Sequence, residues 1–115
     1  MDLNQYQAKA MSTALEVNAE HMAFGLVEEA GEVAAIMKRF HRGDVGYFDE
    51  WASEFDFLSV EAVNKLEAEL GDILWYVAVF ANHLGLSLNE VAIYNLNKLQ
   101  SRKARDMLRG SGDDR

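Results

Sequence analysis

Apolar side chains recur every three or four residues along most of the chain, whereas the alternation typical of a half-buried strand is scarce. This spacing predicts helices, and a sequence without proline allows them to be long. The periodic segments run from about Leu3 to Asn18, from about Met22 to His41, from the residue after Ser59 to His83 or Leu84, and from the Ser87–Glu90 segment to roughly Met107. We therefore expect an all-α helical bundle of about four to five helices.

Short polar residues and glycines mark the ends of these segments. Asp2 and Ser59 are residue types that cap helix N-termini, because their side-chain oxygens accept backbone N–H groups. The sequence SLNE at Ser87–Glu90 has the form of a capping box. Gly43 and Gly85 are suited to end the second and third helices.

The chain has 115 residues, which is enough for one domain with a modest core. We assign residues 1–109 to this domain and residues 110–115, GSGDDR, to a C-terminal tail. Residues 43–57 combine glycines, acids and aromatic side chains, so we expect a loop there that can contain a short helix.

Composition and charge narrow the setting of the protein. The formal net charge is −8, which argues against a nucleic-acid binder, because such a protein needs a basic face. A chain without cysteine excludes disulfides and thiolate metal sites and fits a cytoplasmic setting. Residues 1–20 lack the pattern of a signal peptide, and the longest apolar run, residues 73–81, is too short to span a bilayer. We expect a cytoplasmic protein without a membrane partner.

Two acidic pairs lie inside apolar helical segments. Glu29 and Glu32 are three residues apart and share a helix face, and Glu69 and Asp72 repeat this spacing. If the two helices pack antiparallel with the acids facing, burying the unpaired charges costs several kcal/mol. Mg²⁺ or Mn²⁺ would offset this cost, because both prefer oxygen ligands. The alternative is a pair of solvated acidic faces, and both interpretations stay open at this point.

A row of polar and basic residues follows the last predicted helix. Its members are spaced by three or four residues and comprise Asn95, Lys98, Arg102, Arg105 and Arg109. For Arg105 and Arg109 we favour an ordinary solvated face. For Lys98 and Arg102 the sharper hypothesis is recognition of a polyphosphate, with metal on one side and cations on the other.

The two acidic motifs together resemble the MazG-like all-α nucleoside triphosphate pyrophosphohydrolases. The motifs are Glu28-Glu29-Ala30-Gly31-Glu32 and Glu69-Leu70-Gly71-Asp72, and the likeness extends through GDILWY, NLNKLQSRKAR and GSGDDR. The resemblance implies hydrolysis of a nucleoside or deoxynucleoside triphosphate between its α and β phosphates. It also implies Mg²⁺ on an antiparallel helix pair, bound by Glu29, Glu32, Glu69 and Asp72. Glu28 would be an auxiliary ligand or, with Glu29, a catalytic carboxylate that orients or deprotonates water.

Further roles follow from the same resemblance. Lys98 and Arg102 would bind the phosphates, and Asn95 would hydrogen-bond the nucleotide or a ligand carboxylate. Tyr76 can contact the sugar or base, or it can pack in the core. Family members are usually homodimers or dimers of dimers with sites near subunit contacts. One departure is the 36 residues between Glu32 and Glu69, more than in the compact form of the motif.

Two other function classes compete with this hypothesis. A di-iron helical oxidase normally needs E-x-x-H pairs, and neither motif here carries the histidine. A non-catalytic helical nucleotide-binding or interaction module would keep the scaffold without turnover, since a fold and a motif do not guarantee activity. Four intact acids count against this second alternative.

Overall fold

The secondary-structure elements of the described part of the chain are all helices, joined by turns and short connectors. A computed structural model describes residues 1–51 and 57–115, and these contain four helices and no named strand. The helices are α1 (Leu3–Met11), α2 (Ala19–His41), α3 (Val60–His83) and α4 (Leu88–Ala104). The predicted all-α class is confirmed.

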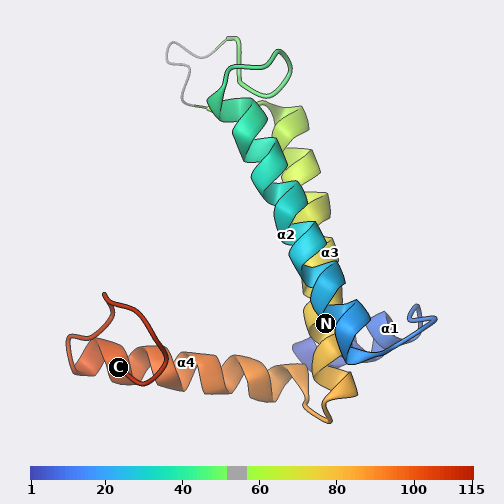
Figure 1. Ribbon diagram of the computed structural model, residues 1–115, viewed down its shortest axis with the longest axis vertical. Coiled ribbons are helices and arrows are strands. Elements are labelled where there is room, and N and C mark those ends of the chain that lie inside the picture. Colours follow the sequence, from blue (N-terminus) through green and yellow to red (C-terminus); the bar gives the residue numbers. More distant parts are fainter. Residues whose placement is uncertain (52–56) are drawn as a thin grey trace.

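Two long helices form one arm of the molecule and α4 forms another (Figure 1). Helices α2 and α3 run antiparallel along each other, as the sequence predicted for the pair that carries the acidic motifs. Helix α1 packs at the lower end of this pair, where it contacts α3 and α4. Helix α4 contacts α1 and α3 but not α2, and it extends away from the pair. None of the helices in residues 1–51 and 57–115 is long and apolar enough to cross a bilayer.

The helix starts follow the predicted capping residues. The Asp2 side chain accepts a hydrogen bond from the backbone N–H of Gln5, whose own side chain completes a capping box. Ser59 caps α3. Ser87 and Glu90 form the predicted capping box of α4. Short polar side chains thus satisfy the first N–H groups of these helices.

The first helix is shorter than the periodicity predicts, ending at Met11 and not near Asn18. Two hydroxyl groups end it: Ser12 donates to the carbonyl of Lys9, and Thr13 donates to the carbonyl of Ala10. Asn18 has extended backbone angles and caps α2. A residue in that conformation cannot also extend α1, so residues 12–18 form a connector.

The last helix also stops before the predicted end near Met107. Asp106 adopts a left-handed backbone conformation with φ 55°, which no helix interior contains. The N–H of Met107 then returns to the carbonyl of Arg102 at 2.7 Å. This closing pattern satisfies a terminal carbonyl and ends the helix at Ala104.

The connection between α2 and α3 lies at the far end of the long arm (Figure 1). Phe48 pairs with Leu58 in an isolated antiparallel bridge, and the N–H of Asp49 donates to the carbonyl of Phe57 at 2.7 Å. Residues 43–51 form turns, as expected for a loop. The short helix considered for this loop falls partly on residues 52–56, which lie outside the described residues.

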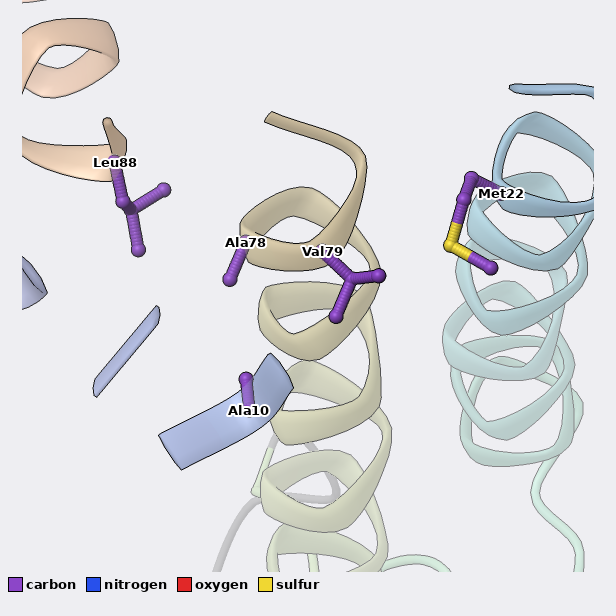
Figure 2. Packing of buried hydrophobic residues seen from close by; sticks show 5 residues of the cluster. All are labelled: Ala10, Met22, Ala78, Val79 and Leu88. Carbon is purple, nitrogen blue, oxygen red and sulfur yellow. The ribbon is translucent and has the colours of Figure 1, made fainter. Parts of the chain in front are cut away.

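The core lies where the two arms meet. Its buried members come from all four helices (Figure 2) and are Ala10, Met22, Ala78, Val79 and Leu88. Gln7 supports this junction, because its buried side chain donates to the carbonyls of Ala78 and Leu86 and accepts the N–H of Leu88. The junction fixes the start of α4 relative to α3.

Candidate functional site

Three carboxylates of the two acidic motifs converge across the α2–α3 pair. Glu29 comes from α2, and Glu69 and Asp72 come from α3. One oxygen of each lies within 4.8 Å of one oxygen of the other two. The antiparallel packing of the two helices therefore brings acids together that are 40 or more residues apart in sequence.

The electrostatics of Glu29 show the effect of this crowding. Its pKa is raised, first by partial burial, then by the negative charge of Asp72 and by hydrogen bonding with Glu69. The charges of Glu69 and Glu28 raise this pKa further. Like charges at this separation disfavour full ionisation unless a counter-charge binds. The metal-free chain thus holds an unfavourable concentration of negative charge at this point.

The other two acids of the first motif lie beside this group. Glu28 and Glu32 have exposed side chains on α2, and neither belongs to the group within 4.8 Å. Glu32 is three residues beyond Glu29, about 4.5 Å along the helix axis. The structure therefore brings three of the four predicted metal ligands together and leaves the fourth one turn away, on the same helix.

Tyr76 lies one turn beyond Asp72 and packs between the helices. Its ring contacts the backbone of α2 at Gly25, where a Cβ atom would overlap the ring. The same ring meets Trp75 edge to face, with centroids 5.0 Å apart. Of the two roles considered for Tyr76, packing has direct contacts in the structure, and contact with a nucleotide stays a prediction.

The predicted phosphate-binding residues lie on the other arm. Asn95 is exposed, Lys98 is half-buried and Arg102 is buried, all on α4. Lys98 and Arg102 are 10 and 14 residues beyond Leu88 in the core, so they lie about 15 and 21 Å along α4 from the junction. Within one chain, α4 does not contact α2, which carries Glu29. The acids and the cations therefore belong to separate arms.

The chemistry of the acidic group fits a hard divalent cation. Three carboxylates provide oxygen ligands only, which suit Mg²⁺ or Mn²⁺ better than a soft metal. Mg²⁺ is usually held by one or two carboxylates and keeps several waters, so three converging oxygens are sufficient for it. The fold and this site define an all-α protein with a cluster of three carboxylates, suited to a divalent cation, across an antiparallel helix pair.

Comparison with known proteins gives the family. The chain belongs to the MazG family, because residues 18–105 match the family described as "MazG nucleotide pyrophosphohydrolase domain". The match includes both acidic motifs and the predicted phosphate-binding residues. Such a domain indicates a pyrophosphohydrolase family whose members typically use a divalent metal.

A relative supports the same grouping over the whole length. The chain is similar to "Gene 37 protein" of Mycobacterium phage L5, with 40% identity over 124 aligned positions that cover all of both chains. The name of this relative does not state an activity. No solved structure matches the chain significantly.

The C-terminal tail contacts the C-terminal half of α4, which the sequence did not predict. Asp113 of the tail forms ion pairs with both Lys98 and Arg102. The only signal in the sequence is the acidic pair Asp113-Asp114 after two glycines, which indicates a tail but no contact. The structure thus assigns a partner to both predicted phosphate-binding cations.

Proposed function

We propose that this chain is a Mg²⁺-dependent pyrophosphohydrolase. It adds water across the bond between the α and β phosphates of a nucleoside or deoxynucleoside triphosphate, giving a monophosphate and pyrophosphate. The observation that carries this proposal is the convergence of Glu29, Glu69 and Asp72 in a chain of the MazG family. A pyrophosphohydrolase needs such a group to gather positive charge beside a polyanionic substrate.

Each acid has a separate part in this proposal. Glu29, Glu69 and Asp72 hold the metal, and Glu32 becomes the fourth ligand by a change of side-chain rotamer, which its exposure allows. Bound Mg²⁺ would neutralise phosphate oxygens and lower the pKa of a coordinated water. Glu28 lies next to Glu29 and is free to orient that water or accept its proton.

The cations of α4 stabilise the phosphates in this proposal, and a second copy of the chain supplies them. The reason is the separation of the arms, since Lys98 and Arg102 lie on a helix that leaves the α2–α3 pair. Apolar side chains are exposed on both arms, among them Phe24 and Val27 on α2 and Leu96 and Tyr94 on α4. A homodimer or homotetramer would cover these side chains and join the acids of one copy to the cations of another.

The activity is tested with a panel of the eight common nucleoside and deoxynucleoside triphosphates in Mg²⁺, with products separated by ion-exchange chromatography. A monophosphate and pyrophosphate from one or more substrates are expected. Asp72→Asn should abolish turnover and keep the helical circular dichroism, whereas the control Glu67→Gln, an exposed acid outside the group, should keep both. Orthophosphate with a diphosphate would contradict the cleavage site. No turnover by folded, Mg²⁺-supplied protein would favour the non-catalytic module.

The shared site is tested by mixing two impaired variants, Lys98→Ala, with weakened activity, and Asp72→Asn, with none. If each site takes acids from one copy and cations from its partner, one of the two sites in every mixed dimer is intact. About a quarter of all sites in a random 1:1 mixture are then intact. The mixture is assayed at subsaturating substrate after exchange of subunits. Activity no higher than the mean of the separate variants would show that one chain completes its own site.

A further inference from the structure

The C-terminal tail folds back onto α4 and places a carboxylate between two cations. Oδ1 of Asp113 lies 3.0 Å from Nζ of Lys98 and 3.1 Å from Nη2 of Arg102. Gly110 and Gly112 have φ of 120° and 84°, a region that favours glycine, and they turn the chain back. Arg115 anchors the end by donating to the carbonyls of Met107 and Leu108. The tail is thus held in a defined position on the helix.

Arg102 is an unusual partner for an exposed tail. It is only 4% exposed, and its Nε has no hydrogen-bond partner among the described residues. Within residues 1–51 and 57–115, its guanidinium bonds only to the tail, through Nη2 to the carbonyls of Gly112 and Asp113 and to Oδ1 of Asp113. A buried donor without an acceptor is costly, so the tail satisfies this guanidinium incompletely. A phosphate offers enough oxygens to bond both Nε and Nη2.

Asp113 itself is held loosely. Its side chain is 80% exposed, and a single oxygen receives both cations. Hydrogen bonds from Lys98 and then Arg102 lower the pKa of Asp113, so the carboxylate is charged at neutral pH. Although Arg102 is buried, the carboxylate is in contact with solvent, and ion pairs that are open to solvent on one side are screened and contribute little to stability. An anion that bonds both cations more completely can therefore displace the tail.

We propose that Asp113 is an internal competitor for the phosphate site: its carboxylate occupies the position between Lys98 and Arg102, and a phosphate group displaces it on binding. The identity of the displacing anion, the phosphates of a nucleotide, rests on the proposed function. Among the described residues, the closed tail provides the only hydrogen bonds and ion pairs of these two side chains, and Lys98 has in addition a cation–π contact with Tyr94. The closed tail also lowers the affinity of the two cations for phosphate below the value that they would have without it.

Binding of inorganic pyrophosphate, measured by titration calorimetry in EDTA, tests this proposal. Without divalent metal, the acids attract no phosphate and are the same in wild type and variant, so the difference between the two titrations reports on the cations. Asp113→Asn should bind pyrophosphate about two- to fivefold more tightly than the wild type, the range expected for loss of an exposed ion pair. Asp114→Asn is the matched control, because Asp114 has no hydrogen bond or ion pair in the described chain, and its affinity should equal that of the wild type. Equal or weaker binding by Asp113→Asn, or no measurable binding by either protein, would overturn the proposal.

Tail release gives an independent readout. Backbone ¹⁵N relaxation should show residues 110–115 becoming mobile when pyrophosphate is added to the wild type, and already mobile in Asp113→Asn. Unchanged tail relaxation at saturation would contradict displacement. The nucleotide panel separates this proposal from the function. Turnover by the wild type without tighter binding by Asp113→Asn refutes only the competitor, whereas tighter binding without turnover of any nucleotide refutes only the hydrolase.

Discussion

Replacing Glu29 by glutamine should stabilise the metal-free protein and weaken its response to Mg²⁺. The substitution keeps the size of the side chain but removes one of three charges that lie within 4.8 Å of one another. The pKa of Glu29 is raised first by partial burial and then by its acidic neighbours, and in the absence of metal the substitution relieves both costs. In the presence of metal, it removes a proposed ligand. The sign of the effect therefore reverses with Mg²⁺.

The magnitude follows from the separation of the charges. Two unit charges at 4.8 Å repel by about 0.9 kcal/mol in water, and physiological salt reduces this to roughly 0.5 kcal/mol. Glu29 has two such neighbours, so the metal-free variant should gain about 1 kcal/mol in unfolding free energy. For a chain of 115 residues this corresponds to a rise in Tm of about 4 °C. Mg²⁺ at 100 times its Kd for the wild type should add about 2.7 kcal/mol to the wild type and less to the variant, which binds the ion more weakly.

Differential scanning calorimetry in EDTA and across a Mg²⁺ series is the assay. The two stability curves should cross, with Glu29→Gln more stable in EDTA and the wild type more stable in saturating Mg²⁺. Glu67→Gln removes the same charge from an exposed position of α3 outside the acidic group, so it should follow the wild type in both conditions. A lower Tm for metal-free Glu29→Gln, or an unchanged Mg²⁺ response, would refute the reasoning.

Three other changes test the surrounding structure. Because the pKa of Glu29 is raised, the folded, metal-free protein holds a proton at this group more strongly than the unfolded chain does. The protonated group therefore stabilises the fold at low pH, and this stabilisation should be lost as pH rises through the raised pKa. Thermal melts against pH should show this loss in the wild type and not in Glu29→Gln. Gly25→Ala should destabilise by about 1–3 kcal/mol because the new methyl meets Tyr76, whereas Gly31→Ala, which meets open space, should stabilise by up to about 1 kcal/mol. Urea titrations of the two variants must shift in opposite directions. Gln7→Leu should cost about 1–3 kcal/mol by stranding its backbone partners, and a loss below about 0.5 kcal/mol would contradict that role.

Local signals were sufficient to predict most of the helices. Capping residues act over three or four positions, so Asp2, Ser59 and Ser87 could be identified from sequence alone. The end of α1 was missed because periodicity continues through residues 12–18, which still pack on the core through Ala14 and Val17. Burial of apolar side chains does not require a helix. Here the hydrogen bonds of two hydroxyl groups and the cap of the next helix determine the backbone conformation.

The acidic site was only partly predictable for a related reason. Spacing places Glu69 and Asp72 on one face of α3, but which oxygens approach Glu29 depends on the register between two helices. That register is set by contacts such as Tyr76 against Gly25, which no periodicity reveals. The direction of α4 depends in turn on the Gln7 hydrogen bonds at the junction. The faces of a helix can be predicted from its sequence, whereas the register of two paired helices depends on contacts in the three-dimensional structure.

The charge distribution explains why both a metal and a set of cations are needed. A chain with net charge −8 repels a triphosphate at long range, so binding depends on strong local attraction. The acids of the α2–α3 pair cannot supply it without a divalent ion, and their mutual repulsion favours binding one. Lys98 and Arg102 are held by the tail until a stronger anion is present. Each half of the proposed site is therefore unfavourable for phosphate when it is alone, because the acids repel it and the cations are paired with Asp113. In the proposed dimer, the substrate gains affinity only where the metal-loaded acids of one copy meet the released cations of the other.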